Sequence, residues 1–323
     1  MGPREWGWWT RQKLDILGAY LQEFARASSK VEERIYLDLF AGWAENRDRD
    51  TGEQFLGSVH RALAARPEFT RVCLFELASK AAALRETLAD MYPGRSGITV
   101  YPGDCNATIP RAFADLASVR WAPTFAFVDQ FDSEIRWRTL QQISRFRRGA
   151  TKAEMWILFG TSFYQRGLNV KKPMMDARYG EEMTAMFGTE DWVPIIQARR
   201  QGALTPGGAR EELLNLMRWR LQDELGYRFS YSLTMINTNG HDLYDMIFVS
   251  DHQAGEKIMR HLYGKAKGEQ GELLRQAQRR RNERRRADAG LVPLFEVEDG
   301  ATAVSSVSVD FSQEPPLPPY GER

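Results

Sequence analysis

Cysteine, histidine and long apolar runs are scarce in this chain of 323 residues, and each scarcity excludes a class of protein. The two cysteines, Cys73 and Cys105, provide neither a disulfide framework nor a zinc cluster. The four histidines are scattered without the spacing of metal ligands. No apolar run is long enough to span a bilayer, and residues 1–11 contain no apolar signal segment. We therefore expect a soluble, cytoplasmic protein without a metal centre.

An excess of charge of one sign is also missing, because 44 basic residues face 43 acidic ones and the net charge is +1. Attraction to nucleic acid must therefore be local. The one dense basic stretch holds Arg279–Arg281 and Arg284–Arg286, within a helix expected over 265–295. These arginines either bind phosphates or form a solvated helix face near the acidic tail, and the lack of interleaved aromatic residues favours the solvated face. Residues 296–323, rich in serine, proline and acidic residues, are expected to be disordered.

Apolar periodicity alternates between strand and helix five times with short links, which is typical of a doubly wound parallel sheet. The expected strands cover residues 34–40, 71–76, 98–101, 124–129 and 154–160. The expected helices cover residues 10–27, 53–66, 79–90, 106–116 and 135–147.

The second half of the chain departs from this alternation. An N-terminal helical segment (1–33) is followed by an α/β domain (34–264), which is interrupted by a helical insertion at 166–208. The domain resumes with a helix at 209–225, strands at 229–236 and 243–249, and a helix at 253–264. Asn239-Gly240 between the two strands predicts a hairpin. The fold class is thus α/β, with a mostly parallel sheet of about seven strands ending in an antiparallel hairpin. Class I methyltransferases have this plan, and other doubly wound folds fit the periodicity as well.

Polar residues follow each of the first four expected strands, where an open parallel sheet binds its ligands. The first strand ends in Asp38-Leu39-Phe40-Ala41-Gly42, in which Gly42 allows a ligand to approach the backbone. Glu76 is placed to accept the hydroxyls of a ribose, and Asp104 to accept the amino group of adenine. Each acid alone is as readily a helix cap. The predicted cofactor-binding residues are Asp38, Phe40, Ala41, Gly42, Glu76, Leu77, Asp104, Cys105 and Asn106.

Over residues 8–264 the chain resembles the three-Cys-motif partner proteins (TcmP). The shared motifs are Lys13-Leu14-Asp15-Ile16-Leu17, Tyr36 to Gly42, Gly57-Ser58, Gly103-Asp104-Cys105-Asn106, Phe127-Val128-Asp129, Glu134-Ile135-Arg136-Trp137, Arg166, Phe187-Gly188 with Trp192, and Tyr244 to Ser250. The resemblance implies a methyltransferase-like fold that binds S-adenosylmethionine. It also implies genomic pairing with a three-cysteine protein that is similar to radical-SAM enzymes.

The resemblance further implies an acceptor site after the fourth strand. The family has Asp-Pro there, similar to the Asp-Pro-Pro-Tyr motif of enzymes that methylate amino groups of bases, whereas this chain has Asp129-Gln130-Phe131. Gln130 either hydrogen-bonds the substrate or marks a site that has lost methyl transfer. Arg166 either binds a phosphate or carboxylate, or forms a salt bridge to Asp129 or Glu134. The predicted catalytic residues are Asp129, Gln130, Phe131, Glu134 and Arg166.

Three functions follow from these residues. The leading one is a methyltransferase that uses S-adenosylmethionine and acts on an amino group of a nucleobase or nucleic acid. The second is a non-catalytic protein of the same fold that binds nucleic acid or the three-cysteine partner. The third is metal-dependent chemistry on Asp38, Asp104 and Asp129. Trp6, Trp8 and Trp9 precede the first helix and either fill the core or border a substrate opening, and the core is favoured.

Overall fold

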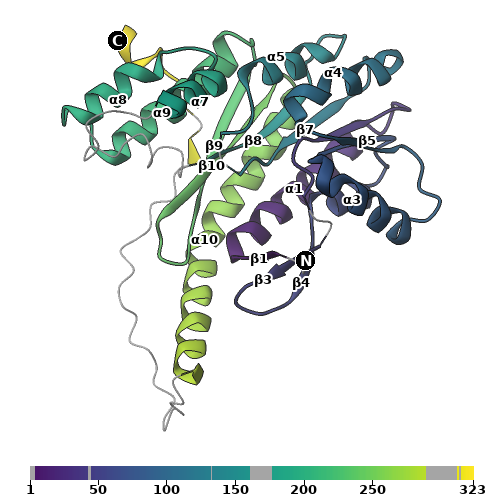
Figure 1. The fold of residues 1–323 in the computed structure, drawn as a ribbon, viewed down its shortest axis with the longest axis horizontal. Coiled ribbons are helices and arrows are strands. Elements are labelled where there is room, and N and C mark those ends of the chain that lie inside the picture. The colour runs from purple at the N-terminus through teal and green to yellow at the C-terminus, as the bar shows by residue number, and fades with distance from the viewer. Residues whose placement is uncertain (1–3, 43–44, 132, 161–176, 289–310, 313) are drawn as a thin grey trace.

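The structure is a computed structural model of the chain that describes residues 4–42, 45–131, 133–160, 177–288, 311–312 and 314–323. Its first half alternates strand and helix as predicted (Figure 1). After helix α1 (Trp8–Ala27), the successive elements are β2 (Ile35–Asp38), α2 (Ser58–Ala64), β5 (Arg71–Glu76), α3 (Ala78–Met91), β6 (Ile98–Pro102), α4 (Cys105–Asp115), η1 (Ala117–Val119), β7 (Thr124–Val128), α5 (Trp137–Phe146) and β8 (Glu154–Gly160).

These strands join the late hairpin in one sheet. The hairpin consists of β9 (Phe229–Ile236) and β10 (Asp242–Ser250), and the strand order is β11-β9-β10-β8-β7-β2-β5-β6. The five strands from β8 to β6 are parallel, while β10 lies antiparallel between β8 and β9. Gly240 in the hairpin turn has φ 78°, as expected for this kind of turn. The order and the antiparallel β10 confirm the predicted α/β fold of the class I methyltransferase type.

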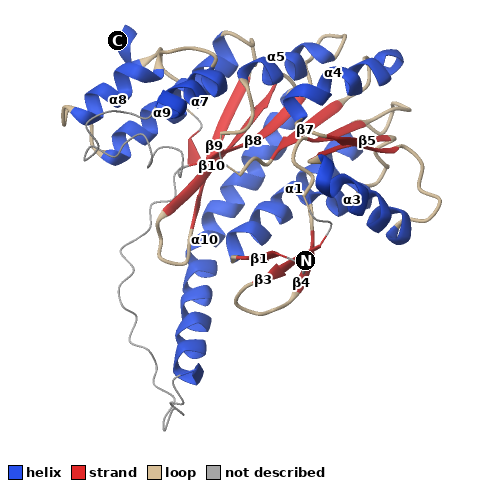
Figure 2. Ribbon diagram, viewed as in Figure 1, coloured by secondary structure: helices blue, strands red, loops and turns tan. Residues whose placement is uncertain are grey.

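Helices cover both faces of the sheet (Figure 2). The strands β7 and β8 are buried at every position, as central parallel strands are. One face packs against α4, α5 and the late helices through residues such as Ile109, Ile143 and Leu213. The other face packs against α1, α2, α3 and α10, with Leu17 and Tyr263 among its fully buried residues. The molecule therefore has three layers with the sheet in the middle.

A small second sheet differs from the prediction. Its strands β1 (Arg4–Trp6), β3 (Glu45–Asp48) and β4 (Gln54–Leu56) lie where the sequence predicted no strand, and the helix expected over 53–66 begins only at Ser58. The residues from 54 to 56 alternate exposed, buried and exposed, which is a strand pattern too short to recognise in sequence. Because β1 pairs with β3, the N-terminus folds back over the loop that follows β2.

The insertion after β8 is helical, as predicted. It contains α7 (Ala177–Phe187) and α8 (Trp192–Arg200), followed by α9 (Pro206–Asp223), which starts at the Thr205 cap. The part of the insertion at 166–176, including Arg166, lies outside the described residues.

The C-terminal region also differs from the expected boundaries. The helices expected at 253–264 and 265–295 form one helix, α10 (Gln253–Asp288). Of the tail expected to be disordered, β11 (Phe311–Ser312) pairs with β9, and residues 314–323, with η2 (Tyr320–Glu322), lie against α8 and α9. Arg218 on α9 donates to the carbonyl of Glu314 at 2.7 Å, and Asn215 pairs with the backbone of Leu317. These partners come from distant sequence, so composition alone could not indicate them.

Glu154, at the start of β8, is a buried carboxyl that links the sheet to α1. It accepts hydrogen bonds from Tyr20 and, at 2.7 Å, from Ser250. Burial raises the pKa of Glu154 to about 7. Because the pKa of this group is higher in the folded state than in the unfolded chain, its contribution to stability is complete at low pH. That contribution is lost as the pH rises from the unfolded value through about 7.

We predict that Glu154→Gln reduces the loss of stability between pH 5 and pH 8 by on the order of 3 kcal/mol. Urea denaturation at a series of pH values measures this change. The matched control is Glu86→Gln on the exposed face of α3, which should leave the pH profile as in the wild type. An unchanged profile in Glu154→Gln would contradict the assignment.

Candidate functional site

A cavity of about 400 Å³ lies at the carboxyl ends of β2, β7 and β8. The chain runs from β2 outward to β5 and β6 and then returns to place β7 on the other side of β2. This reversal is the topological switch point at which open parallel sheets bind ligands, and the volume falls within the range of small-molecule sites. The loop after β2 and the loop after β7 form two walls, while α1 and the small sheet cover the cavity.

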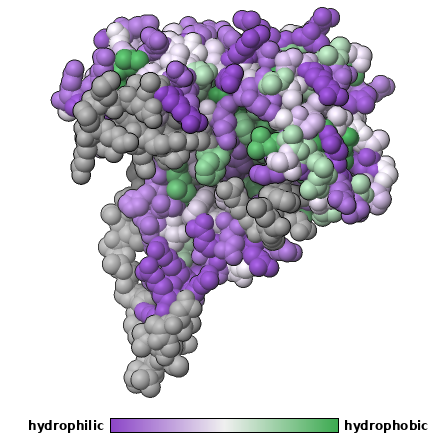
Figure 3. All heavy atoms as spheres, viewed as in Figure 1, coloured by the Kyte–Doolittle hydropathy of each residue, from purple (hydrophilic) through white to green (hydrophobic). Residues whose placement is uncertain are grey.

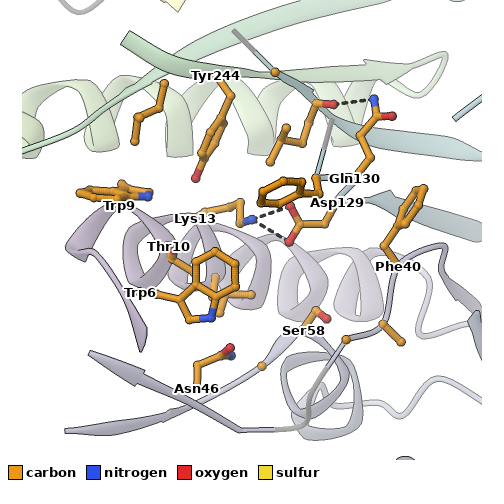
Figure 4. Close-up of a pocket in the computed structure, with 18 of the residues that line it drawn as sticks. Trp6, Trp9, Thr10, Lys13, Phe40, Asn46, Ser58, Asp129, Gln130 and Tyr244 are labelled. Carbon is orange, nitrogen blue, oxygen red and sulfur yellow. Dashed lines mark hydrogen bonds and ion pairs between the residues drawn. The ribbon is translucent and has the colours of Figure 1, made fainter. Parts of the chain in front are cut away.

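The charged centre of the cavity is an ion pair between Lys13 and Asp129 (Figure 4). The Lys13 ammonium contacts both carboxylate oxygens of Asp129, at 2.5 and 2.6 Å. The Lys13 side chain is 6% exposed and that of Asp129 is 24% exposed. The pair joins α1 to the end of β7, and both of its residues line the cavity.

Aromatic side chains surround this pair. Trp6, Trp9, Phe40, Phe131 and Tyr244 all line the cavity, and Phe131 is 70% exposed at its opening. The Lys13 ammonium lies 5.5 Å from the centre of the Tyr244 ring, which further stabilises the cation. Rings on several sides of one polar group are suited to a flat ligand that carries a hydrogen-bonding substituent.

The hydroxyl of Tyr244 is a buried polar atom without a hydrogen-bond partner among the described residues. In Figure 4 it points toward Lys13 and the interior of the cavity. Burial and the nearby Asp129 charge hold the pKa of Tyr244 well above its usual value, so the group stays a neutral donor. An unsatisfied buried hydroxyl costs about 1–3 kcal/mol. A ligand that accepts its hydrogen bond would recover that energy.

Asp38 lies beneath the cavity and does not line it. Its carboxyl is fully buried and accepts from the Tyr36 hydroxyl at 3.0 Å and from Ser58. Burial raises the pKa of Asp38 to about 7, and the charge of Asp129 contributes to the shift. Asp38 therefore holds the loop after β2 in place rather than contacting a ligand directly.

The predicted Asp38–Gly42 turn is present, with Gly42 at φ 62°. The Gly42 amide donates to a carboxylate oxygen of Glu76 at 2.7 Å, and the other oxygen accepts from the Leu77 amide at 2.9 Å. Glu76 thus links the ends of β2 and β5. Phe40, Ala41 and Gly42 line the cavity, whereas Glu76 and Leu77 lie outside its lining. Leu77 is 54% exposed next to Glu76 and offers an apolar surface.

The three residues predicted after β6 have local structural roles. Asp104 caps α4 by accepting from the Asn106 amide at 2.9 Å, which is the alternative that the sequence left open. Asn106 donates to the carbonyl of Glu134 and accepts from the Arg136 amide, so it joins α4 to the loop after β7. Cys105 is buried, and burial raises the pKa of its thiol to about 12. Of the three, only Asp104 is exposed at the edge of the sheet.

Two predicted catalytic residues hold the backbone instead. Gln130 is 2% exposed, donates to the carbonyl of Leu158 at 3.0 Å and accepts from the Ile135 amide at 2.9 Å. Its amide group therefore fixes the loop after β7 on β8, and the residue also lines the cavity. Glu134 is exposed, outside the cavity lining, and accepts from the Phe131 amide at 2.8 Å. Both side chains thus bind backbone groups within the protein, and the contacts to a substrate that the sequence predicted for them stay predictions.

Several cavity residues were missed because they come from elements that the sequence assigned to the core or to a helix. Lys13 and Tyr244 appeared only within motifs of the resemblance, and Trp6 and Trp9 were assigned to the core. Trp8 is in the core as expected, at 7% exposure, whereas Trp6 and Trp9 both pack on the core and line the cavity. A lysine among apolar positions of α1 was the available signal.

Within the described ranges, no three histidine, cysteine or acidic side chains are grouped closely enough to share a metal ion. Asp38, Asp104 and Asp129 therefore do not form the acidic cluster of the third hypothesis. None of the helices in the same ranges combines the length and apolar character needed to cross a membrane.

Comparisons with known proteins add little to the fold described above. No protein-family model matches the chain, and no curated protein matches it. The resemblance to the three-Cys-motif partner proteins therefore stays a prediction. A solved structure described as "a putative O-methyltransferase from Klebsiella pneumoniae" is 13% identical, with 72% of this chain and 79% of that chain covered and a TM-score of 0.36. The fold assignment depends on the strand order and not on this similarity.

We predict a coupling of about 1–3 kcal/mol between Lys13 and Asp129, because the pair is largely desolvated. A double-mutant cycle with Lys13→Met and Asp129→Asn, followed by urea denaturation, measures it. The control cycle uses the exposed pair Lys265 and Glu269 on α10, 3.8 Å apart, with an expected coupling of about 0.3–0.5 kcal/mol. Equal coupling in both cycles would show that the cavity pair has no special environment.

Proposed function

We propose that this protein is a methyltransferase that uses S-adenosylmethionine and acts on an amino group of a nucleobase. The observation that carries the proposal is the cavity at the switch point of the sheet. There the Asp129 carboxylate and the unpaired Tyr244 hydroxyl lie among aromatic rings, next to the Gly42 turn.

The residues at the neighbouring strand ends are compatible with the cofactor. S-adenosylmethionine supplies a methyl group that its sulfonium already activates. The Gly42 turn would hold its amino-acid end, since a glycine at φ 62° exposes the backbone there. The Glu76 carboxylate is held at two backbone amides and has remaining lone pairs for ribose hydroxyls. The exposed Leu77 would contact the adenine ring, and the outer carboxylate oxygen of Asp104 would accept from its amino group.

The acceptor base would occupy the aromatic cavity. Its amino group would donate a hydrogen bond to Asp129, whose position Lys13 fixes. The Tyr244 hydroxyl would donate to a ring nitrogen or carbonyl oxygen of the base. Phe131, exposed at the opening, would stack on the ring. After methylation, the surplus proton on the nitrogen would pass to the Asp129 carboxylate.

A second function is favoured by one observation. Both oxygens of Asp129 are already held by Lys13, and the Gln130 amide is used within the protein. A site of this kind suits a non-catalytic protein that binds nucleic acid or a three-cysteine protein similar to radical-SAM enzymes. Cofactor binding without turnover on any nucleic acid would support this alternative.

We predict that the wild-type protein binds S-adenosylmethionine or S-adenosylhomocysteine, and that Glu76→Gln weakens binding at least about tenfold by replacing one acceptor oxygen with a donor. Isothermal titration calorimetry measures both affinities. Glu86→Gln, at an exposed carboxylate on α3 outside the cavity lining, is the control and should bind as the wild type does. Absence of heat with either ligand in the wild type would refute the proposed cofactor.

We further predict that Tyr244→Phe lowers methyl transfer to nucleobases about tenfold and leaves stability unchanged or up to about 1 kcal/mol higher, because it removes an unsatisfied buried hydroxyl. Activity assays and urea denaturation test both parts. The control is Tyr231→Phe, which loses a 2.8 Å hydrogen bond to Glu256 far from the cavity. That variant should lose stability and keep activity. Full activity in Tyr244→Phe would show that the Tyr244 hydroxyl does not bind the acceptor.

A further inference from the structure

The C-terminal part of α10 contains a strongly basic stretch, residues 279–286, called the arginine segment below. Residues 279–286 contain six arginines and one glutamate, while the whole chain has a net charge of only +1. Arg279, Arg280, Arg284 and Arg285 are all exposed. This part of α10 extends beyond the sheet, and Figure 3 shows hydrophilic side chains gathered over the same lower part of the molecule.

The arginine segment contacts two turns whose strands lead to the cavity. Arg281 donates to the side-chain oxygen of Asn239 in the β9–β10 turn at 2.6 Å. Arg284 donates to the carbonyl of Arg49 in the β3–β4 turn at 3.0 Å. The segment therefore lies between the two turns and is fixed to the domain by these contacts.

The same two turns continue directly into the cavity wall. Asn46, three residues before Arg49, lines the cavity, and so does Leu243, four residues after Asn239. At about 3.4 Å per residue in a strand, the arginine segment lies roughly 10–14 Å from the cavity along either path. An extended nucleic-acid strand would cover this distance with a few nucleotides.

We infer that the arginine segment of α10, with Arg49, binds the phosphates of a single nucleic-acid strand whose base enters the aromatic cavity. This inference rests on the proposed function, because it identifies the polymer that carries the acceptor base. Guanidinium groups pair with phosphate oxygens through two parallel hydrogen bonds, and arginine has five N–H donors, so Arg284 keeps donors for a phosphate. The stacking aromatics missing from the helix are supplied by Trp6 and Phe131 at the cavity.

A single strand is favoured over a duplex because the cavity is enclosed by side chains on several sides. A base inside a duplex must leave the stack to enter such a site, whereas a base in a single strand is already accessible. Phosphates on either side of that base would then follow the basic surface.

The test compares two double variants with equal loss of charge. Arg284→Gln/Arg285→Gln removes arginines on the side of α10 that faces the domain, near Arg281 on the helix surface. Arg279→Gln/Arg286→Gln removes two from the opposite side. Fluorescence anisotropy with a short single-stranded oligonucleotide, as DNA and as RNA, measures binding without cofactor. Thermal denaturation checks that all proteins are folded.

We expect the first variant to bind at least about tenfold more weakly and to reduce the salt dependence of log Kd by about 1, and the second to bind within about threefold of the wild type. Equal weakening by both variants would overturn the inference, since it would show only diffuse attraction. The inference also fails if the wild type binds no oligonucleotide, or if it binds a duplex or a polyglutamate peptide as tightly.

A turnover assay separates this inference from the proposed function. The first variant should raise KM for the oligonucleotide and leave kcat and KM for the free nucleoside unchanged. If S-adenosylmethionine does not bind, the proposed function is wrong, whereas the anisotropy result, which is measured without cofactor, still tests the arginine segment. If the protein methylates a nucleoside but binds no oligonucleotide, only the inference about the arginine segment is wrong, and the proposed function stands.

Discussion

The short strand β2 carries the constraint on which the rest of the site depends. It is hydrogen-bonded to β5 on one side and to β7 on the other, and all four of its residues are buried. Because the chain leaves β2 in one direction and returns on the other side, the loops after β2 and β7 diverge and leave a cavity between them. The loop after β2 is held by Asp38 from below and by Glu76 from the side.

The cavity is completed by parts of the chain far from β2 in sequence. Helix α1 contributes Lys13, which pairs with Asp129 across 116 residues, and β10 contributes Tyr244. The antiparallel placement of β10 matters here, since it brings the start of that strand, and not its end, to the ligand edge of the sheet. An added parallel strand would have presented its C-terminal residues there instead.

Polar residues at this edge divide into two kinds. Gln130, Asn106 and Glu134 satisfy backbone groups of the loops and thereby hold the cavity open, as buried polar groups generally require a partner. Asp129 and Tyr244 instead place polar groups at the cavity. A proline after Asp129 would have stiffened the loop through its ring, whereas Gln130 stiffens it through two hydrogen bonds.

The sequence by itself determined the order of elements and the line of strand ends, because apolar periodicity and turn residues are local properties. It indicated β2, the strands from β5 to β8, the hairpin at Gly240 and the turn at Gly42 close to their observed places, but not β3 or β4. Tertiary structure decided which residues line the cavity and which bind neighbouring backbone groups. Asp104 caps α4 and Gln130 holds the loop after β7, while Lys13 and Tyr244 line the cavity. The reason is physical: a side chain's partners are set by packing between distant segments, and a carboxylate, an amide or a lysine looks the same in sequence whatever it contacts.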